Sequence, residues 1–213
     1  MILKKNVYCL HKVLQDTVLF DEFKYKAEKA LYDETTWKEY KELLKTEHIS
    51  IADRAFYFWY VNRTSVNGIG GFSYSGIHVR KGLHYTLRKM HASIERLQEI
   101  HNKLLTVIIT NKNVFELLPK YDHDTVCMYL DPPYPLSTRN GKAYVIEWSD
   151  EDHRRLVEML LNIKNPKILL SGYDNEIYKE LENNGWKKES FQANSSSAAG
   201  MAQSKTENLW LNY

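Results

Sequence analysis

The chain has 213 residues, 43% of them hydrophobic, enough for the core of one domain or of a domain that carries an insertion. Its formal net charge of +2 favours no class of partner by itself, and two distant cysteines, Cys9 and Cys127, exclude a disulfide framework or a metal-ligand cluster. No apolar run reaches the roughly 20 residues that a membrane span needs. No signal peptide is present, so we expect an intracellular protein.

The amino-terminal part of the chain is predicted to be helical. Apolar residues at helical spacing predict a first helix over residues 3–14. Two further amphipathic helices are predicted over Phe20–Leu31 and Thr36–Leu44, the latter with Thr36 and Glu39 at the spacing of a capping box. Residues 51–61 are densely apolar and predict a buried helix.

A block of basic residues follows, because Asp53 is the last acid before Glu95. The positive side chains between them are Arg54, Arg63, Arg80, Lys81, Arg88 and Lys89. Such a block fits a surface that faces phosphates, and a solvated basic face is the alternative. Within it, glycines alternate with apolar residues over about 62–86, which predicts a hairpin.

Such a hairpin, together with the polar residues beside it at 62–64, would suit a nucleic acid. Arg80 and Lys81 could contact phosphates and set the register, while Asn62, Arg63 and Thr64 could read base edges. The glycines at 68, 70 and 71 superficially suggest a phosphate-binding loop. They do not follow a predicted strand, so we interpret them as a turn.

The next elements alternate between helix and strand. A helix is predicted over residues 87–100, a buried strand over Leu104–Thr110 and a short helix over Phe115–Leu118. Asn111 and Asn113 stand at the carboxyl end of that strand.

A second apolar run, Thr125–Leu130, predicts a buried strand of a parallel sheet, and Asp131, Pro132, Pro133 and Tyr134 follow it directly. Open α/β sheets bind ligands at this end of their strands. The prolines lack N–H groups and leave carbonyl acceptors, Asp131 adds a carboxylate, and Tyr134 offers a flat ring. Together they suit a planar base with an exocyclic amino group. A plain proline-rich turn is the alternative.

The carboxyl-terminal part begins with a polar segment, residues 135–142, in which Arg139 could meet phosphates if the segment closes over a substrate; a plain surface loop is the alternative. The elements predicted after it are a helix opened by Ser149 with Asp152 at the capping-box position, a strand over 167–171, a helix over 175–183, and strands over 187–192 and 208–213. Residues 193–204 are expected to be disordered unless DNA orders them.

The segment Tyr129–Tyr134 matches the catalytic motif of amino-group DNA methyltransferases, and the surrounding chain resembles the adenine-specific Dam type. Phe58–Gly68 is similar to that family's Phe-x-x-x-Asn-Arg-x-x-x-Asn-Gly segment. Leu169–Asp174 resembles the strand and turn after the catalytic motif, and Lys205–Tyr213 resembles the closing strand.

The resemblance implies an α/β fold: an incomplete Rossmann-like methyltransferase sheet, mostly parallel with an antiparallel edge hairpin, plus a helical and hairpin target-recognition insertion. It assigns residues 15–100 to target recognition, with the hairpin at about 62–86. Residues 1–14 and 101–213 are assigned to the catalytic domain.

The resemblance further implies a site-specific DNA adenine methyltransferase, which transfers a methyl group from S-adenosyl-L-methionine to N6 of a flipped-out adenine. It implies double-stranded DNA as partner, no metal and no membrane, and a cytoplasmic, nucleoid-associated enzyme of bacterial or phage restriction-modification type. The catalytic residues are then Asp131, Pro132, Pro133 and Tyr134, and the cofactor-binding residues are Asp131 and Asn113, which replaces the usual acid. The DNA-binding residues are Asn62, Arg63, Thr64, Asn67, Arg80, Lys81, Arg88 and Arg139.

The chain also departs from the family. Members carry a lysine-containing segment, a Phe-x-Gly-x-Gly loop and a strand ending in an acid before the helix that opens this chain. We therefore expect a truncated or partner-requiring form that binds S-adenosyl-L-methionine weakly or not at all, with a second polypeptide or self-association completing the sheet. Two alternatives stay open: a catalytically inactive DNA-binding module of the same fold, or a methyltransferase that acts on protein or RNA. Aspartate at position 131 favours adenine, because related glutamine-modifying enzymes have asparagine there.

Overall fold

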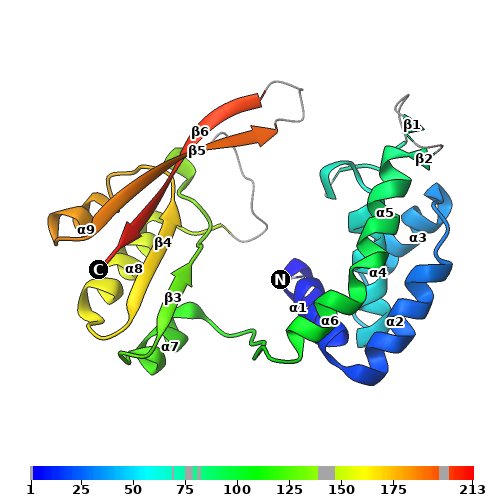
Figure 1. Cartoon of the computed structure of the whole chain (residues 1–213), viewed down its shortest axis with the longest axis horizontal. Coiled ribbons are helices and arrows are strands. Elements are labelled where there is room, and N and C mark those ends of the chain that lie inside the picture. The colour runs from blue at the N-terminus through cyan, green and yellow to red at the C-terminus, as the bar shows by residue number, and fades with distance from the viewer. Residues whose placement is uncertain (1, 69, 75–78, 81–82, 139–146, 197–201) are drawn as a thin grey trace. The chain divides into compact units, whose positions relative to one another are not determined.

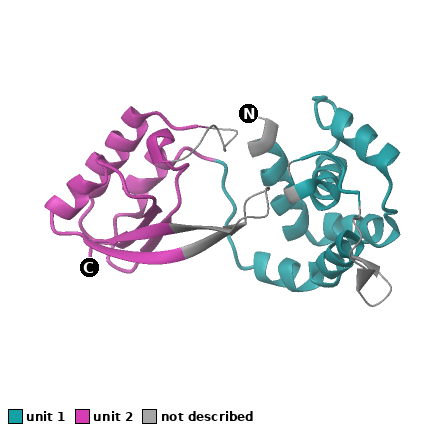
Figure 2. Ribbon diagram, turned by 90° about the horizontal axis from the view of Figure 1, so that it is seen from above, with its two compact units in different colours: residues 1–111 teal, residues 112–213 magenta. Residues whose placement is uncertain are grey.

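The computed structural model describes residues 2–68, 70–74, 79–80, 83–138, 147–196 and 202–213 (Figure 1). They form two compact units, residues 1–111 and 112–213, and each is described by itself (Figure 2). The first unit contains α1 (Ile2–Gln15), α2 (Thr17–Lys29), α3 (Glu34–Leu43), α4 (Ile51–Thr64), β1 (Val79–Arg80), β2 (Leu83–His84), α5 (Tyr85–Glu95) and α6 (Leu97–Leu104). The second contains α7 (Val114–Leu117), β3 (Cys127–Leu130), α8 (Asp150–Asn162), β4 (Lys167–Gly172), α9 (Lys179–Asn183), β5 (Lys187–Ser196) and β6 (Ala202–Leu211). Among the described helices, none is long and apolar enough to cross a membrane.

Helix α4 forms the centre of the first unit and packs against α1, α2, α3 and α5. A helix contacted on most of its sides must be apolar nearly all round, as the predicted buried helix is. Its Phe56, Trp59 and Tyr60 are buried, and Phe23 of α2 meets the Trp59 ring edge-on at 5.7 Å between centroids. The aromatic residues of this region therefore build the helical core.

Buried Arg54 of α4 belongs to this core and is not part of a basic surface. It is 2% exposed, and its guanidinium donates to Asn6 Oδ1 at 3.1 Å and to the carbonyls of Leu44 and Thr46 at 3.2 and 2.6 Å. A buried charge needs such partners. The basic block of the sequence thus includes at least one structural arginine.

The helix caps confirm one predicted capping box and correct another. Ser149 and Asp152 form the expected reciprocal pair at the start of α8. Helix α3 begins earlier than predicted, at Glu34, and its N-cap is Asp33, whose carboxylate accepts from the Thr36 backbone N–H at 2.6 Å. The prediction of a box opened by Thr36 was wrong, because Thr36 lies inside the first turn that Asp33 caps.

The strand predicted over residues 104–110 was also wrong. Helix α6 runs to Leu104, and Gln15 Nε2 donates to the carbonyls of Leu104 and Val107 at 2.7 and 2.5 Å, which holds the chain in a turn. A strand needs a neighbour for its backbone groups, and no described strand of the first unit pairs with this segment; Ile108 is 88% exposed. The single helix predicted over 87–100 is likewise two helices, α5 and α6, with Arg96 between them.

The packing units differ from the functional domains implied by the resemblance. Helix α1, assigned with the catalytic domain, packs against α2, α4 and α6 in the first unit. A unit defined by packing is a separate property from a functional domain, so the functional assignment of residues 1–14, 15–100 and 101–213 stays a prediction.

The second unit is a four-stranded sheet in the order β3-β4-β6-β5. Strands β3 and β4 are parallel, with Leu130 opposite Leu170, whereas β4 pairs antiparallel with β6 and β6 with β5. Helix α8 connects β3 to β4 and buries Leu156 and Leu160 in the same core as Ile168 and Leu170 (Figure 1). The sheet is therefore mixed, with one parallel pair among the described strands where a mostly parallel sheet was expected.

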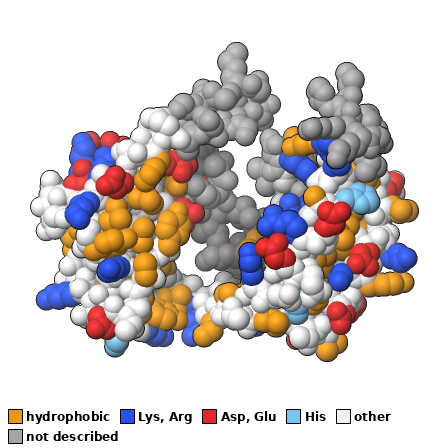
Figure 3. Space-filling model, in the orientation of Figure 1, with side chains coloured by type: hydrophobic (Ala, Val, Ile, Leu, Met, Phe, Trp, Pro, Cys, Tyr) orange, Lys and Arg blue, Asp and Glu red, His pale blue; other side chains and the backbone are white. Residues whose placement is uncertain are grey.

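Strand β3 lies at an edge of this sheet and is buried on one face only within its unit. Met128 points to the core, whereas Cys127 is exposed and Tyr129 is 64% exposed. Figure 3 shows hydrophobic side chains gathered over this sheet. The apolar run Thr125–Leu130 predicted a buried core strand that includes Cys127, but within this unit the core covers only the face that carries Met128, so Cys127 is exposed.

The β5–β6 hairpin is longer than predicted. Residues 193–196 and 202–204, expected to be disordered, continue the two strands, and their register runs from Lys187 opposite Leu211 to Ser196 opposite Ala202. Backbone pairing across ten residue pairs compensates for the small polar side chains that suggested disorder.

Candidate active site

The segment Asp131–Tyr134 lies where two parallel strands end side by side. Asp131 follows the last residue of β3, and Ser171 occupies the next-to-last position of β4. Asp131 is exposed, whereas Ser171 is 5% exposed, and its hydroxyl donates to Asp131 Oδ1 at 2.9 Å. The same hydroxyl lies 3.2 Å from the Leu130 carbonyl, but it has one proton, and the shorter contact is to the carboxylate. The carboxylate is thus both open to solvent and held from inside the sheet.

The two prolines shape the turn after Asp131. Pro132 is buried and Pro133 half-buried, and neither has an N–H group. No hydrogen bond from another described residue reaches the Pro132 carbonyl. The turn continues into a 3₁₀ turn over Leu136–Thr138, in which Thr138 donates to the Pro135 carbonyl through its N–H at 3.0 Å and its hydroxyl at 2.8 Å. The Pro132 carbonyl, which follows Asp131 directly in the sequence, therefore has no backbone donor among the described residues.

The ring of Tyr134 is packed against the turn that follows β4. It is half-buried and meets Tyr173 edge-on, with ring centroids 4.6 Å apart and an interplanar angle of 72°. Aromatic pairs favour this geometry. The pair restricts the Tyr134 ring on one side and leaves the ring partly accessible.

Close to Tyr134 lies a group of buried polar and aromatic side chains around Tyr178. Tyr178 is fully buried, its hydroxyl is 2.9 Å from His153 Nδ1, and its ring meets Trp210 edge-on at 5.1 Å. Burial, and secondarily the nearby Tyr134 phenol, raises the pKa of Tyr178 above its ordinary value. Tyr178 thus stays neutral, and its contacts with His153 and Trp210 hold its ring in place near Tyr134.

Sequence reasoning missed the supporting residues Ser171, Tyr173 and Tyr178. The first two lie in the stretch Leu169–Asp174 that carried a resemblance, so the signal was present without a role attached to it. Nothing in the sequence pattern places Tyr178 near Tyr134, because its position depends on how it packs with Trp210 of β6.

The family model for D12 class N6 adenine-specific DNA methyltransferases matches residues 2–194 of the chain. The chain belongs to this family. The match confirms the resemblance drawn from the motifs and indicates adenine-specific methylation of DNA as the activity. A comparison with curated proteins gave no match.

The end of α4 holds three of the residues that this methyltransferase was expected to direct at DNA. Arg63 is exposed. Asn62 Nδ2 donates to the Gly68 carbonyl at 3.0 Å, and Gly68 has a φ of +79°, where a Cβ would lie 2.8 Å from that amide nitrogen. Thr64 is fully buried and its hydroxyl donates to the Tyr60 carbonyl at 2.7 Å. The structure thus offers Arg63 to a ligand, uses Asn62 to hold the turn, and places Thr64 inside the unit.

The remaining expected DNA contacts are described in part. Arg88 of α5 is half-buried, and its guanidinium lies 5.7 Å from the Tyr85 ring centroid. Strands β1 and β2 form a short antiparallel pair with Arg80 opposite Leu83. Lys81 and Arg139 lie outside the described residues, as do the side chains of Asn67 and Arg80. The predicted hairpin over 62–86 is thus confirmed for its two short strands.

Asn113, expected at the methyltransferase cofactor site, is the N-cap of α7. It is exposed, and its Oδ1 accepts from the Phe115 N–H at 3.1 Å. Its Nδ2 has no partner among the described residues and could donate to a ligand. Within the described part of the chain, no group of three or more His, Cys, Asp or Glu side chains is placed to hold a metal ion.

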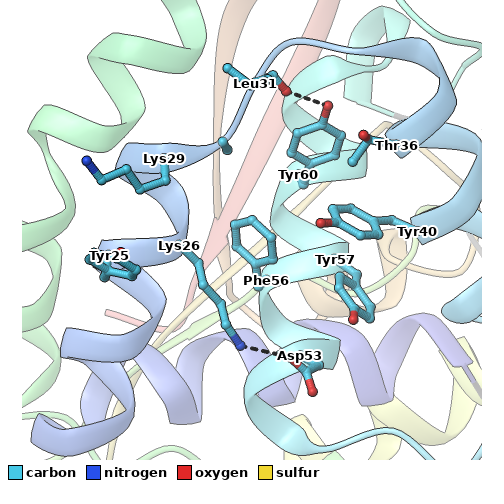
Figure 4. A pocket seen from close by; sticks show the side chains of 11 residues that line it. Tyr25, Lys26, Lys29, Leu31, Thr36, Tyr40, Asp53, Phe56, Tyr57 and Tyr60 are labelled. Carbon is cyan, nitrogen blue, oxygen red and sulfur yellow. Dashed lines mark hydrogen bonds and ion pairs between the residues drawn. The ribbon is translucent and has the colours of Figure 1, made fainter.

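A cavity of about 360 Å³ in the first unit was not expected from the sequence (Figure 4). Aromatic rings from α2, α3 and α4 line it, but its central polar groups already pair within the protein. Lys26 Nζ lies 2.8 Å from Asp53 and 2.6 Å from Glu22, and Tyr60 donates to the Leu31 carbonyl at 2.7 Å. This pairing favours a structural groove, and the site at β3 and β4 remains the candidate.

Proposed function

We propose that the site at the carboxyl ends of β3 and β4 transfers a methyl group from S-adenosyl-L-methionine to N6 of an adenine flipped out of double-stranded DNA. The observation that carries the proposal is an exposed carboxylate, Asp131, whose Oδ1 is held by Ser171 while Oδ2 has no donor among the described residues. Membership of an adenine-specific family supports the choice of base.

The chain's own residues would bind and orient the adenine. An adenine inside a duplex cannot present its amino group, so it must leave the stack. Stacking on Tyr134 would offset part of that cost by about 1–3 kcal/mol. Asp131 and the Pro132 carbonyl would then accept hydrogen bonds from the two amino protons. These bonds draw the nitrogen lone pair out of conjugation with the ring, and the fixed geometry supplies most of the rate.

When bound, S-adenosyl-L-methionine supplies an electrophilic methyl group on a sulfonium centre. Two described residues fit it: the Asp131 carboxylate suits the positive sulfur, and Asn113 Nδ2 can donate to the cofactor. The described glycines of the second unit offer no further cradle, because Gly172 is packed under Tyr178 and Trp210, and Gly185 ends α9 at a φ of +89°. The described residues therefore fit part of the cofactor.

We accordingly propose that this chain alone binds S-adenosyl-L-methionine weakly, and that a second polypeptide or self-association completes the sheet beside β3. An edge strand with unpaired backbone groups is a template for pairing with another strand. Cys127 and Tyr129 are exposed on the same strand. Isothermal titration calorimetry of the isolated chain should detect weak binding; tight binding would refute this part of the proposal.

For target recognition we propose the end of α4, the β1–β2 hairpin and the start of α5. Arg63, which is exposed, is the first candidate for a contact with DNA, and half-buried Arg88 is the second. Arginine can neutralise a phosphate or bind a guanine edge through two hydrogen bonds. Asn62 would act indirectly, through the turn that it holds at Gly68.

The test is transfer of a tritiated methyl group to unmethylated double-stranded DNA, at saturating S-adenosyl-L-methionine and with excess protein. Asp131→Ala should abolish transfer and leave DNA binding intact, whereas Asp124→Ala, which removes an exposed carboxylate before β3, should leave both unchanged. Transfer by Asp131→Ala at the wild-type rate would refute the site. DNA binding without transfer by the wild-type chain would favour an inactive DNA-binding module.

A further inference from the structure

We infer that Ser171 is a positioning residue for Asp131: it fixes one carboxylate oxygen so that the other faces the substrate amino group. The inference rests on the proposed function and assigns a role to a residue outside the catalytic motif. It starts from the 2.9 Å hydrogen bond between Ser171 Oγ and Asp131 Oδ1.

The first argument concerns the burial of Ser171. The neighbouring core positions of β4, Ile168 and Leu170, are apolar and fully buried, whereas Ser171 places a hydroxyl at 5% exposure. A buried hydroxyl is costly unless it has a partner. The partner here is an exposed carboxylate, which water could already solvate, so the hydrogen bond is not required to satisfy Asp131. The serine instead fixes the orientation of the Asp131 carboxylate.

The second argument concerns the freedom of the Asp131 side chain. Asp131 follows the last residue of an edge strand and is exposed, so packing does not select its rotamer. An aspartate has a staggered first torsion and a broad second one. A hydrogen bond from the rigid interior of the sheet restricts both torsions at once and leaves Oδ2 as the available acceptor.

The third argument separates this contact from general sheet stability. Ser171 is paired with Leu209 of β6 through backbone groups, which a change of side chain leaves in place. The chain also offers a matched control: on β5, Ser190 Oγ donates to Asn208 Oδ1 of β6 at 2.7 Å. That bond joins two side chains of the same sheet at its other edge. Removing it should cost stability alone.

The experiment compares Ser171→Ala, the near-isosteric Ser171→Cys and Ser190→Ala with the wild-type chain. Both Ser171 variants should lose about 10- to 100-fold in kcat, the scale of a small misplacement of a reacting group, with KM for DNA unchanged. Ser190→Ala should keep the wild-type kcat. Ser171→Thr retains the hydroxyl and should recover most of the rate. Wild-type kcat in both Ser171→Ala and Ser171→Cys would overturn the inference.

A second measurement does not depend on catalysis. Three-bond NMR couplings that report the first torsion of Asp131 should show one rotamer in the wild-type chain and in Ser190→Ala, and averaging over rotamers in Ser171→Ala. Equal averaging in all three would overturn the positioning role. A single wild-type rotamer that is lost in Ser171→Ala, in a chain that transfers no methyl group even at saturating S-adenosyl-L-methionine, would uphold the positioning role and count against methyl transfer by this chain.

Discussion

Adding one methyl group at Gly172 should lower the stability of the chain, because two buried rings lie against this position. A Cβ at this position would lie 3.1 Å from Tyr178 Cε2 and 3.4 Å from Trp210 Cζ3. Both rings are fully buried, so neither can swing into solvent. Overpacking of this kind costs about 1–3 kcal/mol of unfolding free energy. For a chain of this size that corresponds to a decrease in Tm of roughly 2–12 °C.

Thermal unfolding followed by circular dichroism measures this effect, and Gly71→Ala is the matched control. A Cβ at Gly71 meets no atom within 4 Å, so that variant should keep the wild-type Tm or raise it slightly. Because Gly172 packs against Tyr178, which lies near Tyr134, Gly172→Ala should also slow methyl transfer. A Gly172→Ala chain as stable as the wild type would show that the packing under the motif is loose.

Three further predictions follow from single contacts. Arg63→Ala should weaken DNA binding, measured by fluorescence anisotropy, and reduce the slope of log affinity against log salt by about one. Arg154→Ala should leave both unchanged. Wild-type affinity in Arg63→Ala would show that Arg63 does not contact DNA. Tyr178→Phe should cost about 1–3 kcal/mol in urea unfolding, since His153 Nδ1 loses a buried partner; an unchanged midpoint would contradict that. The hydrogen bond from Lys26 holds the pKa of Asp53 below its ordinary 3.8. The stability that this ion pair contributes is therefore present above pH 3.8 and is lost as the pH falls through the lower, folded-state pKa of Asp53. Asp53→Asn should therefore flatten the fall of Tm below pH 3.8, and an identical slope would argue against the ion pair.

Local signals in the sequence predicted what depends on neighbouring residues. Helical periodicity indicated α1, α2 and α8, a densely apolar run indicated α4, and the capping box at Ser149 and Asp152 appeared as expected. The motif Asp131–Tyr134 was correctly expected at the carboxyl end of a strand. Each of these features is determined by residues that lie close to it in the sequence.

The errors concern features that depend on distant partners. Residues 104–110 are rich in β-branched and apolar side chains, yet Gln15 holds the start of the segment in a turn and no described strand of its unit pairs with it. The full length of the β5–β6 pairing was missed because backbone pairing along the hairpin outweighs the weak strand propensity of its small polar residues. The hydrogen bond from Ser171 to Asp131 joins two strands 40 positions apart, and a single sequence holds no signal for it.

The most direct measurement for the central claim is mass spectrometry of nucleosides from DNA incubated with the chain and S-adenosyl-L-methionine. The account predicts N6-methyldeoxyadenosine with the wild-type chain and with Asp124→Ala, and none with Asp131→Ala. Methylated cytosine in its place, or the same yield of methylated adenine from Asp131→Ala, would contradict it.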